Sequence, residues 1–157
     1  MPRDDLVQTL RALLDSQAVA ALGTLHDGAP YVSMVPFVLL PGKGALVIHV
    51  SGLAAHTKDM VADPRVSLLV MAAQGPDVSA QALARVTLQG EAAQIPEEAP
   101  IHAVAKQAYL ARFPSSAQTF ELGDFALFAI RLTTARYVGG FAQAKTIGPE
   151  TLAAALE

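Results

Sequence analysis

The sequence predicts a mainly β protein with flanking α-helices (α+β), built around a β-barrel or a curled sheet. Six or more short apolar runs are separated by turn-like segments, whereas few stretches have the spacing of an amphipathic helix. Tight turns such as His26-Asp27-Gly28 join the early runs. A doubly wound parallel sheet needs a helix between most pairs of strands, so these turns argue against that fold.

The first third of the chain predicts one helix followed by strands. Asp4 or Asp5 can cap the helix, in which leucines recur along one face. The predicted strands are residues 17–25, 31–40 and 45–50. Pro36 interrupts the second of them. Because proline cannot donate to a ladder, we expect an edge, a bulge or a ligand-facing kink at this point.

The rest of the chain alternates strands with short helices. We expect helices at residues 53–63, 97–112 and 150–156, and strands at residues 65–72, 82–93, 125–132 and 136–145. Pro114 ends the second of these helices because proline breaks a helix interior. Gly139-Gly140 breaks the last strand, either as a bulge or barrel corner or as a place where the backbone approaches a flat ligand.

The composition is that of a folded globular chain, and we expect residues 1–157 to form a single domain. The net charge is −3 and the basic residues are scattered, so nucleic-acid binding is not expected. No apolar run is long enough to span a bilayer, and the N-terminus lacks the apolar segment of a signal peptide. The sequence has no cysteine, which excludes disulfides, and a cytoplasmic protein is the default expectation.

Few residues suggest metal binding or catalysis. The histidines are scattered, whereas a zinc site needs three or four converging ligands. The chain has no HExxH pair, no Gly-x-Ser-x-Gly elbow and no P-loop. The sequence therefore predicts no metal site and identifies no catalytic acid, base or nucleophile.

Polar and basic side chains gather at the start of the helix predicted at residues 53–63. Ser51, His56, Thr57 and Lys58 lie there, and the unpaired N–H groups of a helix start attract anions. Two interpretations remain open, a phosphate site and an ordinary helix capped by Ser51. Helical geometry directs Lys58 nearly opposite His56, so His56 and Thr57 are the better candidates for a phosphate site.

Six segments in a fixed order resemble one known family. They are residues 22–24, 31–37, 51–60, 63–69, 85–90 and 137–141. Their order and spacing resemble the FMN-binding split-barrel family of pyridoxamine 5′-phosphate oxidases, and within it the haem-utilisation-type branch. The resemblance implies a six-stranded antiparallel split β-barrel that works as a homodimer, with FMN in two clefts between the subunits.

The resemblance also implies which residues contact the cofactor. These positions are Ser33, Met34, Val35, Pro36, His49, Val50, Ala55, His56, Thr57, Arg85, Gly140 and Phe141. Ser51 and Lys58, at the helix start, complete the set of candidate cofactor-binding residues. The strand that carries the first four would lie beside the flavin ring. His56 would contact the phosphate, and Arg85 would reach the flavin from the partner subunit.

The implied function is that of an FMN-binding oxidoreductase whose small-molecule substrate is unassigned. The flavin in such a protein performs the redox chemistry, and the protein supplies a dry cleft and a phosphate anchor. The alternative is a non-catalytic dimer that binds flavin or haem, in which haem binding would depend on His49 or His56. The chain has no tryptophan, which the family's oxidases use at the flavin. It also has no histidine after His102, where haem-utilisation proteins carry one.

Overall fold

The described residues form eight β-strands, and the computed structural model describes residues 2–40, 42–140 and 143–157. The strands are β1 (Val19–His26), β2 (Ala29–Pro36), β3 (Val38–Leu40), β4 (Ala45–Ser51), β5 (Arg65–Met71), β6 (Arg85–Gln94), β7 (Phe125–Val138) and β8 (Ala144–Ile147). All of them pair antiparallel, in the order β2-β1-β5-β6-β7-β4-β3, and β8 pairs with β7.

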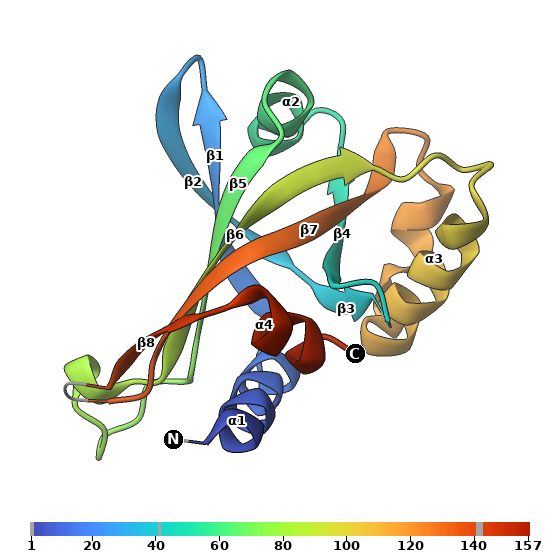
Figure 1. Ribbon diagram of the computed structural model, residues 1–157. Helices are drawn as coiled ribbons and strands as arrows, with labels where there is room; N and C mark the ends of the chain where they lie inside the picture. The colour runs from blue at the N-terminus through green and yellow to red at the C-terminus, as the bar shows by residue number, and fades with distance from the viewer. Residues whose placement is uncertain (1, 41, 141–142) are drawn as a thin grey trace.

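The sheet curls into a barrel that is open along one side (Figure 1). β2 and β3 are the two ends of the strand order, and β2 approaches β4 without a ladder between them. Each of the two end strands therefore has one edge whose backbone groups no described strand pairs. This arrangement confirms the predicted antiparallel split barrel and its class.

The number of strands differs from the six that the resemblance implied. Pro36 ends β2, in agreement with the interruption expected at this proline. The next residue, Phe37, donates its N–H to the Ala18 carbonyl at 3.1 Å before β3 begins. The predicted break at Gly139-Gly140 is confirmed, whereas the predicted gap between strands at residues 125–132 and 136–145 was wrong. β7 runs unbroken to Val138, and β8 is a short separate strand that returns along it.

Four α-helices and two 3₁₀ helices accompany the barrel. They are α1 (Arg3–Ser16), α2 (Ala55–Ala62), α3 (Pro100–Arg112), α4 (Pro149–Ala155), η1 (Ala80–Ala82) and η2 (Pro114–Glu121). The predicted cap of the first helix was wrong, because Pro2 holds the N-cap position and Asp4 and Asp5 lie inside the first turn. No helix among the described residues is long and apolar enough to cross a membrane.

The helices close the barrel at its ends and cover one side. α1 and α4 pack on each other at one end, and α2 lies at the opposite end (Figure 1). Leu10 and Leu14 of α1 are fully buried in the main hydrophobic core. α3 packs over β3, β4 and β7, where a second, smaller core forms around Tyr109.

β4 is buried on both faces, which explains its nearly continuous apolar sequence. Leu46 and Ile48 point into the main core, whereas Ala45 and Val47 point into the second core beneath α3. The side chain of His49 follows the same alternation and lies on the side covered by α3 and η2.

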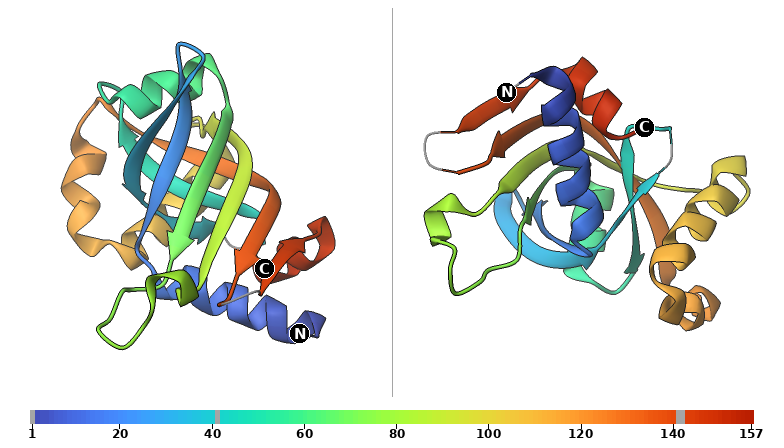
Figure 2. Two further views of the ribbon diagram at one scale, coloured as in Figure 1. Left: turned by 90° about the vertical axis from the view of Figure 1, so that its left-hand side faces the viewer. Right: turned by 90° about the horizontal axis from the view of Figure 1, so that it is seen from below.

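The outer faces of β1, β2 and β5 have no helix over them (Figure 2). Side chains that point away from the barrel are therefore exposed, and several are apolar. The exposed apolar residues of this face are Val19, Val32, Met34, Leu69 and Met71. We call this surface the open sheet face.

Candidate functional site

The structure distributes the predicted site residues over three places. Ser33, Met34, Val35 and Pro36 lie on β2, and Ala55 and His56 begin α2 at the open side of the barrel. His49, Thr57 and Lys58 line a cavity on the other side of α2. Arg85 and Gly140 lie near the far end of β6 and β7, and Phe141 lies outside the described residues.

A hydrogen bond between Ser33 and His56 joins the end strand β2 to the first turn of α2. Ser33 Oγ lies 3.0 Å from His56 Nδ1. His56 Nε2 has no hydrogen-bond partner among the residues that the structure describes. Burial lowers the pKa of the His56 imidazole below its ordinary value, although the nearby Asp59 carboxylate raises it in part. The imidazole is therefore neutral at pH 7.

A buried carboxylate fixes α2 to the β1–β2 hairpin. Asp59 is 4% exposed, and its Oδ2 accepts a hydrogen bond from Thr24 Oγ1 at 2.8 Å. His26 Nδ1 lies 2.7 Å from Asp59 Oδ1 and donates to it, since an ionised carboxylate can only accept. This network positions the helix that carries His56.

The neighbours of His56 contribute in different ways. Val35 and Val50 are buried in the main core, so only their backbone is available to a ligand. Met34 points the other way and is 60% exposed on the open sheet face. Ala55 has no polar side-chain atom and is half-buried.

Ser51 does not cap α2, which corrects one of the two interpretations of the helix start. Ala54 holds the N-cap position, and no side chain caps the helix. The Ser51 hydroxyl instead accepts a hydrogen bond from the Leu53 N–H at 3.1 Å and donates to Asp124 Oδ2 at 2.8 Å. This pair fastens the loop before α2 to the start of β7.

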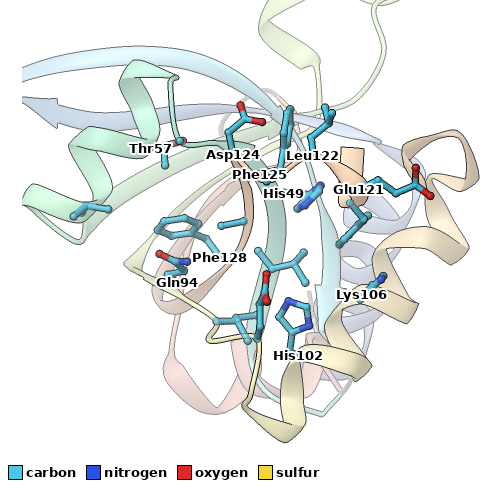
Figure 3. Close-up of a pocket in the computed structure, with 18 of the residues that line it drawn as sticks. His49, Thr57, Gln94, His102, Lys106, Glu121, Leu122, Asp124, Phe125 and Phe128 are labelled. Carbon is cyan, nitrogen blue, oxygen red and sulfur yellow. The ribbon is translucent and has the colours of Figure 1, made fainter. Parts of the chain in front are cut away.

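A cavity of about 940 Å³ lies between α2, α3, η2 and the strands β4 and β7 (Figure 3). Thr57, Lys58 and Val61 line it from α2, and His102 and Lys106 line it from α3. The cavity is also lined by His49 of β4, by Gln94 at the end of β6 and Ile95 after it, by Phe120 of η2 and by Phe125 at the start of β7. We call this space the α2–α3 cavity.

The His49 ring is held in an aromatic cluster at the wall of this cavity. Its centroid lies 3.8 Å from that of Phe120, with 9° between the planes, and 5.2 Å from that of Phe125. Tyr109 meets it edge-on at 5.7 Å. Burial lowers the pKa of His49 to about 4, and the charges of His102 and Lys106 add to this effect. His49 is therefore neutral at physiological pH.

Thr57 and Lys58 differ sharply in their surroundings. Thr57 is 6% exposed, and its Oγ1 is fully buried without a hydrogen-bond partner among the described residues. Lys58 is exposed at the rim of the cavity. His56 does not line this cavity, so Lys58 and His56 lie on different sides of α2, as expected. Thr57, which was expected to share a phosphate site with His56, lies on the side of Lys58 instead.

Arg85 is held at the opposite end of its strand from α2. It begins β6 beside Val138, and its guanidinium donates to the carbonyls of Gln81 and Leu83 at 2.9 and 3.0 Å. Gly140 follows the end of β7 with a φ of 156°. Within one chain, the structure does not bring Arg85 or Gly140 to His56.

Sequence reasoning missed most of the α2–α3 cavity. The α3 side chains His102 and Lys106 sit on a predicted helix, but η2, which carries Phe120, was expected only as the chain after a helix stop. The continuous apolar run of β4 was the available signal, because a strand buried on both faces needs a covering element. Within the described ranges, no three or more histidine and acidic side chains are grouped so that they could hold a metal ion.

Comparisons with known proteins agree on the type of chain. The family model described as pyridoxamine 5′-phosphate oxidase matches residues 6–139. The chloroplastic non-canonical haem oxygenase HOZ of Arabidopsis thaliana is 36% identical over 141 residues, which are 88% of this chain and 41% of that protein. This chain therefore spans less than half the length of that relative.

Solved structures show the same fold. A haem-binding protein from Mycobacterium smegmatis superposes with a TM-score of 0.84 at 32% identity, over 94% of this chain and 60% of that one. ChuZ of Campylobacter jejuni superposes with a TM-score of 0.83 over 96% of this chain and 62% of that one. At 18% sequence identity, this similarity shows a shared fold only.

Proposed function

This chain belongs to the pyridoxamine 5′-phosphate oxidase family, and from that membership we propose that it is a haem-binding module. The proposed site is the free edge of β2 beside the first turn of α2. Two relatives above 30% identity support haem as the ligand, because one is named a haem oxygenase and the other a haem-binding protein. The observation that carries the proposal is the Ser33–His56 hydrogen bond.

An iron ligand must be a neutral imidazole with one free nitrogen. In proteins, the other ring nitrogen of such a histidine donates to a nearby oxygen, which fixes the tautomer and the ring orientation. His56 meets these requirements when its proton is on Nδ1, since Nδ1 then donates to Ser33 Oγ and Nε2 keeps a free lone pair. Its lowered pKa keeps the imidazole neutral.

FMN, which the family resemblance implies, fits the same edge less well. A flavin phosphate needs positive charge or several N–H donors. Of the implied phosphate-contacting pair, Ala55 carries no charge and His56 is neutral. Lys58, the nearest basic residue in sequence, lies at the rim of the α2–α3 cavity instead. Haem, when bound, would supply the redox-active iron, and the protein residues would position it.

We also propose that the module is a homodimer. The open sheet face leaves apolar side chains exposed, among them Val32 at 70% and Met34 at 60%. A second copy is a natural cover for such a face, because two-fold dimers bury the same patch on both subunits. Arg85 and His56 of one subunit lie at opposite ends of the barrel. Only the Arg85 of a second subunit could therefore approach His56.

Haem titration of single histidine variants tests the site. We expect the wild type and His102→Ala to bind haem with a shifted Soret band, and His56→Ala to lose this shift. Ser33→Ala should weaken binding by roughly tenfold or more, because it removes the group that orients the imidazole. An unchanged Soret shift in His56→Ala would contradict the assigned ligand.

Mass spectrometry of the small molecule released on denaturation tests the identity of the ligand. We expect haem from protein produced with added haem. Release of FMN instead would overturn the proposal in favour of a flavoprotein.

A further inference from the structure

We infer that the α2–α3 cavity is a second ligand site, which takes an uncharged aromatic molecule carrying a hydroxyl or N–H donor. Its volume of about 940 Å³ falls within the range of small-molecule pockets. It is separate from the β2 edge, because neither Ser33 nor His56 lines it. The inference does not depend on haem binding.

The first observation is an unsatisfied hydroxyl next to the cavity. Thr57 Oγ1 is the one fully buried side-chain oxygen or nitrogen in the described part of the chain that lacks a hydrogen-bond partner. Thr57 lines the cavity from the first turn of α2 (Figure 3). Oγ1 itself is fully buried and is not accessible from the cavity, so it marks an unsatisfied polar group next to the cavity and not a direct contact for a ligand.

The second observation is a free acceptor on His49. Thr119 Oγ1 donates its single hydrogen to the Ser116 carbonyl at 2.8 Å, so it accepts from His49 Nδ1 at 3.2 Å. The proton of the neutral ring is therefore on Nδ1, and Nε2 carries a lone pair. Nε2 has no partner among the described residues and is not fully buried. At neutral pH it can only accept, because protonation requires a pH near 4. The ligand must bring the hydrogen-bond donor.

The wall around these groups is aromatic. His49, Phe120 and Phe125 form a cluster of rings, and Ile95 adds an aliphatic surface. Such a lining favours a flat apolar body, which stacks on or meets the edges of the rings.

The charges of the cavity lie at its exposed rim and have both signs. Lys58 and Lys106 are exposed, as are Glu97 and Glu121, and Lys106 Nζ lies 5.2 Å from the centroid of the Phe120 ring. The rings around His49, which belong to Phe120 and Phe125, and the neighbouring Ile95 carry no charge, and His49 itself is neutral at neutral pH. Burying an unpaired charge is costly, so the buried part of the ligand is uncharged.

Fluorescence titration of the purified chain with 2-naphthol, compared with 2-methoxynaphthalene, tests the inference. The two probes share their ring system, but only the first has an O–H donor. We expect saturable 2-naphthol binding, with 2-methoxynaphthalene weaker by about tenfold or more because His49 Nε2 is left without a donor. Equal affinities, or no saturable binding of 2-naphthol, would overturn the inference.

Variants locate the binding. His49→Phe keeps an aromatic ring, removes the acceptor and should abolish the preference for the hydroxylated probe. Gln107→Ala, on the exposed surface of α3, is the control and should bind like the wild type. An unchanged preference for 2-naphthol in His49→Phe would show that the probe sits elsewhere. Haem titration of the same variants separates this result from the proposed function.

Discussion

At the scale of single residues, the polar groups around α2 decide what this chain can bind. His56 and His49 are both neutral, but for different reasons. His56 sits beside Ser33 at the open side of the barrel, whereas His49 is enclosed by aromatic rings on the opposite side of the helix. Their roles therefore separate, one as a candidate iron ligand and the other as an acceptor for an organic ligand.

The His26–Asp59 pair makes a pH-dependent contribution to the stability of the same region. A hydrogen bond with the Asp59 carboxylate raises the pKa of His26, and that stabilisation is lost as pH rises through the raised value. Burial opposes ionisation of Asp59, but hydrogen bonds from His26 and Thr24 lower its pKa overall. That contribution is lost as pH falls through the lowered value. The pair therefore stabilises most between the ordinary carboxyl and imidazole pKa values, about 4 to 6.5.

Replacement of His26 tests this contribution. We expect His26→Gln to lower the melting temperature more at about pH 5.5 than at about pH 9, because only the charged imidazole forms an ion pair with Asp59 in addition to the hydrogen bond. The measurement is thermal unfolding across pH. In an Asp59→Asn background the same substitution should lose its pH dependence. An equal loss at both pH values would contradict the ion pair.

At the scale of elements, Gly90 of β6 shows how one residue permits a bend in the barrel. The β6–β7 register shifts between Gln89 and Gly90. A Cβ on Gly90 would lie within 2.2 Å of the Arg131 carbonyl oxygen, which is backbone and cannot rotate away. This close approach explains why a glycine occupies a buried position of the strand.

Substitution of Gly90 should therefore destabilise the barrel. We expect Gly90→Ala to lower the free energy of unfolding by about 1–3 kcal/mol or more, because the two strands must separate to admit the methyl group. Chemical denaturation measures the change. Gly75→Ala is the matched control, since nothing lies within 4 Å of its added Cβ. Equal effects of the two substitutions would show that the close approach carries no cost.

Elements with a clear period were predictable from sequence, whereas the shortest strands were not. The amphipathic leucines of α1 and the alternation along β6 fix those elements, because a period of 3.6 or 2 reflects one buried face. β3 and β8 are too short to show a period, and their pairing partners determine them. The cap of α1 was mispredicted, because Asp4 lies within the first turn. The Ser51 cap, one of two open interpretations of the start of α2, does not form, because Ser51 bonds Asp124 instead.

The candidate site was predictable only in part. The residues at the start of α2 were identified, and helical geometry separated His56 from Lys58. The α2–α3 cavity was not foreseen, because Phe120 belongs to a 3₁₀ segment whose position depends on tertiary packing against His49. Single-sequence patterns carry no information on such non-local contacts.

At the scale of the whole molecule, the open sheet face controls assembly. Its exposed apolar side chains belong to three neighbouring strands, β1, β2 and β5, so they form one continuous surface. We expect a glutamate at Leu69 to convert the proposed dimer into a monomer, because a buried unpaired charge at an interface is costly.

Sedimentation equilibrium measures this change. Val104→Glu, on the outer side of α3, is the control because Val104 is as exposed as the residues of the open sheet face but lies on another element. The wild type and the control should sediment as dimers. A monomeric wild type, or a Leu69→Glu protein that stays dimeric, would contradict the proposed assembly.

The unequal protection of β4 and β2 has a consequence for dynamics. β4 has a strand on each side and is covered on both faces, so hydrogen exchange of its amides requires near-global opening. β2 has one unpaired edge and an exposed outer face, so its amides exchange through smaller, local openings. The proposed haem site thus lies on a strand that opens locally, at the edge of a barrel that is otherwise stable. A ligand can enter and leave there while the barrel stays folded.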